Sequence, residues 1–118
     1  MIEEMIYTAL TDANIPGVTG VDAVVMPQQC DYPRIRYQRV GVETIQQHDS
    51  GDVCDVPSFQ IDVYGHNYKQ VREIAVAVRA TMAAATDFTA RFITESGDDY
   101  EPEHRLFRVS QDFRVWSD

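Results

Sequence analysis

The stretch that decides the fold runs from Pro57 to Met82 and reads PSFQIDVYGHNYKQVREIAVAVRATM. Its first part alternates between apolar residues and more polar ones, with Phe59, Ile61 and Val63 on one side. This period of two is typical of a strand that buries one face. After Gly65 the period changes, so the stretch predicts a strand that ends in a sharp turn.

The second part of the stretch predicts a long helix. Its apolar residues recur at helical spacing, at Val71, Ile74, Ala75, Val78 and Met82. Asn67 is the expected N-cap, and Gln70, three residues on, is its reciprocal partner. A helix from Asn67 to about Ala85 would place this apolar stripe against the sheet that the strand belongs to.

The segments before this stretch add one helix and two strands. An apolar stripe from Ile2 to Ala13 predicts an amphipathic helix, which Asn14 and Pro16 should end. Short strands are expected at Val21–Met26 and Arg34–Val42. In the second of these the alternation changes face near Arg39, which indicates a bulge. Residues 43–55 show no period and predict a long polar loop, of the kind that is usually functional or disordered.

The segments after the stretch add two strands. Residues 87–93 and 105–116 alternate, and a polar turn is expected between them at Glu95–His104. The predicted order is therefore α-β-β-β-α-β-β. We expect one α+β domain over residues 1–118, with two helices packed on one face of a mostly antiparallel sheet.

Composition excludes several classes of protein. The formal charge is −9, with 19 acidic and 10 basic residues, so nonspecific binding of nucleic acid is not expected. The longest apolar run is far shorter than the ~20 residues that cross a bilayer, and no export signal is expected at the N-terminus. Cys30 and Cys54 are then best interpreted as reduced thiols.

No motif predicts catalysis or a cofactor. The contiguous His48, Asp49 and Ser50 cannot easily align as a triad, because triads are assembled from separate elements. The acids of residues 49–55 fail the calcium-loop spacing. The acidic residues between Glu95 and Glu103 and the three scattered histidines are better interpreted as solvated surface than as a metal site. We therefore expect no enzyme, no cofactor and no metal.

The sequence predicts interface residues more readily than catalytic residues. Arg, Tyr and Trp recur at the energetic centres of protein interfaces, and a sheet covered on one side leaves its other face for neighbours. On this basis the candidate interface residues are Arg36, Tyr37, Tyr64, Arg108 and Trp116.

Taken together, three segments resemble a known family. They are YPRIRYQRV at 32–40, QIDVYGHNYKQVREIAVAV at 60–78 and DFRVW at 112–116. Their order and spacing resemble the tail-completion proteins of long-tailed bacteriophages and prophages, a group related to the tail terminator of phage lambda. The resemblance extends from about Tyr7 to Trp116 and supplies no catalytic residues.

The resemblance implies a virion protein assembled in the host cytoplasm. Such a protein forms a hexameric ring that caps the head-proximal end of the tail tube, ends polymerisation and offers a surface for the head connector. Phage DNA would pass through the ring without specific binding. The polar segments are the candidate lumen or assembly loops, with Gln47, His48, Asp49, Asp52, Asp55, Asp98, Asp99, Glu101 and Glu103.

Two other functions remain open at this stage. One is another neck component, such as a head-side connector, which would share a small α+β fold. The other is a small-molecule-binding or enzymatic α+β domain unrelated to phages. Six copies would carry about −54 (six times −9), so we expect mostly monomers at low ionic strength and rings when tail tubes are present.

Overall fold

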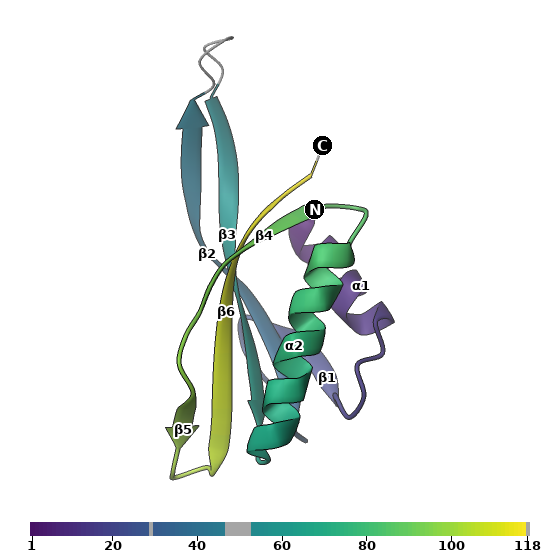
Figure 1. Ribbon diagram of the computed structural model, residues 1–118, viewed down its shortest axis with the longest axis vertical. Helices are drawn as coiled ribbons and strands as arrows, with labels where there is room; N and C mark the ends of the chain where they lie inside the picture. The colour runs from purple at the N-terminus through teal and green to yellow at the C-terminus, as the bar shows by residue number, and fades with distance from the viewer. Residues whose placement is uncertain (29, 47–52, 118) are drawn as a thin grey trace.

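The computed structural model describes residues 1–28, 30–46 and 53–117, with the backbone alone described for 43–46 and 53–55. Two helices and one six-stranded sheet make up this part of the chain (Figure 1). The elements in chain order are α1 (Ile2–Asp12), β1 (Gly20–Ala23), β2 (Arg34–Gln46), β3 (Val53–Gly65), α2 (Tyr68–Ala84), β4 (Thr89–Glu95), β5 (Asp99–Glu101) and β6 (Leu106–Trp116). The α+β class and the order of the main elements are confirmed.

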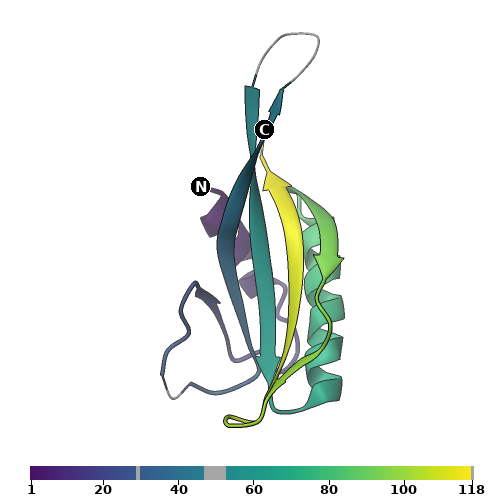
Figure 2. The same ribbon diagram turned by 90° about the vertical axis from the view of Figure 1, so that its left-hand side faces the viewer.

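The sheet has the strand order β1-β2-β3-β6-β4, with β5 paired to β6 beyond that path. All pairs are antiparallel except β1 with β2, which are parallel. Both helices lie on the same side of the sheet (Figures 1 and 2). α2 packs over β3, β6 and β4, and α1 packs beside α2 and over β1. We call the other side of the sheet, which neither α1 nor α2 covers, the open face.

The core lies between the helices and the sheet. The apolar positions predicted for α2 are all at most 2% exposed. They pack with Ile6 and Leu10 of α1 and with the inward side chains of the central strands, namely Phe59, Ile61, Val63, Val109, Phe113 and Val115. The two periodicities in the sequence therefore identify both layers of the core.

The turn from β3 into α2 follows the prediction closely. The side chain of Asn67 accepts a hydrogen bond from the backbone N–H of Gln70 at 3.0 Å, which confirms the N-cap. A Cβ on Gly65 would lie 2.7 Å from Cγ2 of Val71, so the first turn of α2 approaches the strand end too closely for a side chain. Gly65 thus allows the helix to pack directly on its own strand.

Two predicted boundaries were wrong in the first half of the chain. β1 ends at Ala23 and not at Met26, because Val24 adopts a left-handed φ of 64° and donates its N–H to the carbonyl of Tyr37. The described parts of the predicted loop at 43–55, residues 43–46 and 53–55, are strand, and the rest of it lies outside the described residues. β2 runs to Gln46 and β3 begins at Val53, so they continue as a two-stranded arm beyond the body of the sheet (Figure 1).

The expected bulge is present, and the predicted turn at 95–104 is shorter than expected. The register of β2 against β3 shifts between Arg39 and Gly41. β4 extends to Glu95, and Asp99–Glu101 forms the short strand β5, because both segments pair with β6. The arm gives the molecule its elongated shape, 51 Å by 26 Å by 23 Å.

Candidate assembly surfaces

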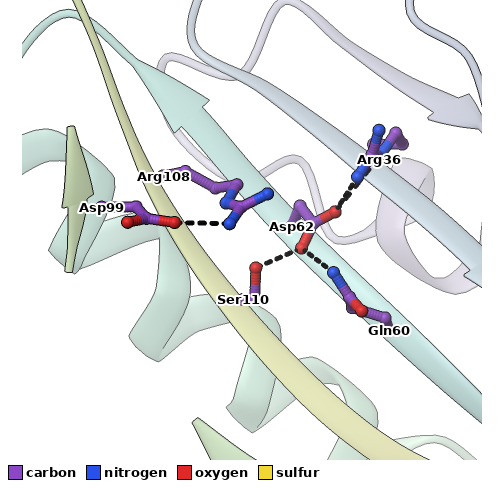
Figure 3. A network of polar contacts seen from close by, with 6 residues as sticks. All are labelled: Arg36, Gln60, Asp62, Asp99, Arg108 and Ser110. Atoms are coloured by element: carbon purple, nitrogen blue, oxygen red, sulfur yellow. Dashed lines mark hydrogen bonds and ion pairs between the residues drawn. The ribbon is translucent and has the colours of Figure 1, made fainter. Parts of the chain in front are cut away.

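The open face carries a buried carboxylate, Asp62, at its centre. Asp62 lies on β3 between Arg36 of β2 and Ser110 of β6, which are its partners in the strand register. Nε and Nη2 of Arg36 lie 3.1 and 2.5 Å from Oδ2 of Asp62. Ser110 Oγ and Gln60 Nε2 donate to Oδ1 at 2.5 and 2.9 Å (Figure 3). Both carboxylate oxygens are therefore satisfied, which a buried charge requires.

A second carboxylate on this face has no such partners among the described side chains. Asp112 of β6 lies opposite Gln60 of β3 on one side and Thr94 of β4 on the other. It is two residues after Ser110, which is the register partner of Asp62. Partial burial raises its pKa, and the negative charge of Asp62 raises it further. The open face thus holds one neutralised acid and one acid that the described residues do not neutralise.

One end of the open face is lined by aromatic and basic side chains. Arg108 pairs with Asp99 of β5 (Figure 3), and the guanidinium of Arg36 lies 5.5 Å from the ring of Tyr64. A cavity of about 480 Å³ opens there, and its lining includes Tyr32, Tyr64, Tyr100, Leu106 and Arg108. Tyrosine and arginine around an apolar hollow are typical of the centres of protein interfaces.

The structure separates the predicted interface residues into two groups. Arg36, Tyr64 and Arg108 come together on the open face around Asp62 and the cavity, while Trp116 lies at the far end of β6 opposite Thr89. Tyr37 must be removed from the set. It is only 6% exposed and packs in the core, because it shares the inward side of β2 with Ile35.

The predicted loop residues also separate. Gln47, His48, Asp49 and Asp52 lie outside the described residues, and Asp55 belongs to strand β3 rather than to a loop. The four acids between β4 and β6 are described: Asp98, Asp99, Glu101 and Glu103.

Three of these four acids have partners within the chain. Asp98 accepts a hydrogen bond from the hydroxyl of Tyr68 at 2.7 Å, and Asp99 pairs with Arg108. Glu101 accepts the backbone N–H groups of Glu103 and His104. Glu103 makes no side-chain ion pair in the described part of the chain. The atoms of Glu101, Glu103 and His104 that could bind a metal ion lie within 4.8 Å of one another. All three residues are exposed, however, and the Glu101 carboxylate already accepts the two backbone N–H groups of the turn.

A polar network on the helix side fixes α2 to the sheet. Gln111 of β6 is 1% exposed, and its Nε2 donates to the carbonyl of Ala75 and to Oε1 of Glu95, both at 3.0 Å. Glu95 also accepts from Arg72 of α2 at 3.0 Å. Burial acts to raise the pKa of Glu95, but the hydrogen bonds from Gln111 and Arg72 outweigh it and lower that pKa.

Sequence reasoning missed both polar centres. Asp62 occupies a polar position in an alternating strand, and Gln111 occupies an inward one, so periodicity alone gives neither residue a partner. The signal that could have found Gln111 is an amide at an otherwise apolar inward position, which must be hydrogen-bonded if it is buried.

The described residues of these surfaces show no arrangement suited to bond making. Among the described residues, the histidines, the acids and the serines do not assemble a nucleophile with a base and an orienting group. In the same part of the chain, none of the helices has the length and apolar character needed to span a membrane.

Comparison with known families decides the kind of protein. The family model for tail completion protein gp17 matches residues 4–118. The chain belongs to this family. It is therefore a structural protein of a phage-like virion and a tail-completion protein, as the three resembling segments predicted.

A solved structure gives the fold independent support. A chain from the virion of a native gene transfer agent (GTA) particle superimposes with a TM-score of 0.59 and 16% sequence identity. The match covers 92% of this tail-completion protein and 81% of the GTA chain. At this identity the likeness shows a shared fold and no more. No curated protein sequence matches the chain.

Proposed function

We propose that this tail-completion protein forms a ring on the head-proximal end of the tail tube, where it ends tube polymerisation and provides the surface on which the filled head docks. The observation that carries the proposal is the family match over residues 4–118. The open face supports it, because a charged and aromatic sheet face without a covering layer is suited to contacts with other subunits. Ring closure would follow from a head-to-tail contact whose rotation closes after six copies.

The direct test is the phenotype of particles made without this protein. If it ends tube growth, such particles have tail tubes of excessive and variable length in electron micrographs. If it acts instead as a head-side connector, tails have normal length but lack heads, and that result would contradict the capping role.

We also propose that the acids between β4 and β6 face the path of the DNA. Negative charge there would let DNA slide without adhering, because like charges repel. Asp98, Asp99 and Glu101 stabilise the fold locally, so replacing all four acids by serine would mix two effects. Glu103→Gln is the cleaner variant, and slower DNA ejection with unchanged thermal stability is the expected result. Unchanged ejection and unchanged tail joining in both Glu103→Gln and the four-serine variant would refute the proposal.

The net charge leads to an expectation for the free protein. Six copies of a chain with charge −9 repel one another over about a Debye length, roughly 30 Å at 0.01 M salt. We expect monomers in sedimentation at low ionic strength and rings once tail tubes are supplied. A stable ring in dilute buffer without tubes would contradict this expectation.

A further inference from the structure

Several strand edges of the described sheet have no partner, and the two longest lie on opposite sides of it, on β4 and on β2. β4 is the last strand on one side, so its outer edge is unpaired over Thr89–Glu95 in the described structure. On the other side β1 covers β2 only from Arg34 to Tyr37. The described remainder of β2, as far as Gln46, has no strand beside it on that edge.

Aliphatic side chains are exposed along both edges. Val40 and Val42 of β2 are 49% and 53% exposed, and Ile93 of β4 is 42% exposed. Ile93 lies at the register shift between Phe92 and Thr94, which leaves it without a cross-strand partner on β6. Single exposed aliphatic residues are common on soluble proteins, but here they lie on backbone edges whose N–H and C=O groups are open to another strand.

The two edges of the arm differ in a way that selects one of them. The pairing of β3 with β6 begins at Ser58, so the part of β3 that belongs to the arm has a free edge on that side. Pro57, the residue just before Ser58, lies in this part. Proline has no N–H to donate and is one of the residues that keep an edge strand from pairing. Neither β4 nor β2 contains a proline. The longest edges without a proline are therefore the outer edge of β2 and the outer edge of β4, whereas the free edges of β1 and β5 belong to strands of only four and three residues.

We propose that the β4 edge of one copy pairs with the β2 edge of the next copy, so that the sheets continue from subunit to subunit. This inference rests on the proposed ring and names the contact that closes it. Because the two edges lie on opposite sides of one sheet, each copy can give one edge and receive the other, which is a heterologous contact. Pairing of β2 with β2 or of β4 with β4 would instead be two-fold and would leave an edge unused. The occupant of each edge is thus a second copy of this chain, held by backbone hydrogen bonds and by contact between Ile93 and the two valines.

Cysteine cross-linking tests this pairing and its direction. After Cys30→Ser and Cys54→Ser, two single-cysteine chains are made, Val42→Cys and Ile93→Cys. They are mixed with tail tubes of the same virus and oxidised, and particles from the same sample are viewed by electron microscopy. Val76→Cys on α2 is the matched control, because Val76 is 65% exposed and belongs to the helix layer rather than to a strand edge.

The expected product is a disulfide-linked dimer that needs both chains, whereas either chain alone, or either chain mixed with Val76→Cys, stays monomeric on the gel. A chain carrying both cysteines should give a ladder of cross-linked oligomers on the gel, of which the largest is the complete ring. Rings in the micrographs without the mixed dimer would overturn the strand pairing and leave the proposed function standing. If neither the cysteine variants nor the parent chain forms rings on the tubes, both the strand pairing and the proposed function would be overturned. Homodimers of either single-cysteine chain would also overturn the head-to-tail pairing.

Discussion

Asp62 is a carboxylate with no solvent exposure on a sheet face that no helix covers. Three side chains from the same sheet bury it and supply its hydrogen bonds, of which Arg36 supplies the charge. A buried ion pair adds little net stability, because desolvation opposes the attraction, but loss of one partner leaves a charge without compensation. The network therefore fixes how β2, β3 and β6 lie beside one another.

Arg36→Ala should destabilise the protein by about 2–4 kcal/mol, because Asp62 is then buried without its counter-charge. Lys69→Ala is the control. Lys69 is 87% exposed and lies 4.0 Å from Glu73, so its loss should cost about 0.5 kcal/mol or less. Urea unfolding at neutral pH measures both values. Equal losses for the two variants would show that Asp62 does not depend on Arg36.

Glu95 and Asp112 should give opposite pH dependences of stability. The pKa of Glu95 is lowered from 4.5 despite its burial, so its contribution is present above about pH 4.5 and is lost as pH falls through the folded-state pKa. The pKa of Asp112 is raised from 3.8 by burial and by Asp62, so its charge destabilises the fold at neutral pH and protonation relieves this. Glu95→Gln should lower the free energy of unfolding at pH 7, and Asp112→Asn should raise it.

Both differences from the parent chain should shrink as pH falls below about 4, since the parent carboxyl groups are then becoming protonated. Urea titrations at neutral and acid pH measure them. Differences of the same sign, or differences that do not change with pH, would contradict the assigned shifts.

At the scale of elements, the sequence predicts what local rules govern. The Asn67 cap, the sharp turn at Gly65 and the bulge after Arg39 follow from residues within a few positions of one another, and all three are present. The length of the arm does not follow from such rules. Glu43–Gln46 forms strand because it pairs with Val53–Val56 across the chain, and no period in either segment indicates that pairing.

The same distinction explains the errors at the candidate surfaces. Tyr37 was predicted at the interface by residue type, but it lies near Tyr7 and Glu3 of α1 and belongs to the core, and α1 lies far from it in sequence. Asp62 became a centre of the open face only because β3 is flanked by β2 and β6. A strand's alternation predicts which residues share a face, and only the strand order decides which of them become central.

Gly65→Ala tests the close packing of β3 against α2. The added Cβ would lie 2.7 Å from Cγ2 of the buried Val71 and 3.4 Å from Cβ of Pro33, so we expect a loss of about 1–3 kcal/mol from overpacking. Gly41→Ala is the matched control, since nothing lies within 4 Å of its added Cβ. Thermal unfolding compares the two. A loss for Gly41→Ala as large as that for Gly65→Ala would contradict the packing argument.

At the scale of the whole molecule, the fold consists of a helix-covered body and a two-stranded arm that projects from it. The network around Asp62 joins β2, β3 and β6, and the network around Gln111 joins α2 to β6 and β4. The described residues bind one another through ion pairs and hydrogen bonds and do not converge on a reactive group. Such a fold is suited to a subunit that acts by its shape and contacts rather than by catalysis, as expected of a tail-completion protein.

The most direct test of the capping role is a titration of tube length in vitro. Purified tail tube protein is polymerised with increasing amounts of this protein, and tube lengths are measured by electron microscopy. The account predicts that tubes become shorter and more uniform as the protein is added, with additional density in the form of a ring at one end only. Tubes whose length does not depend on the protein, or density bound along their sides, would contradict it.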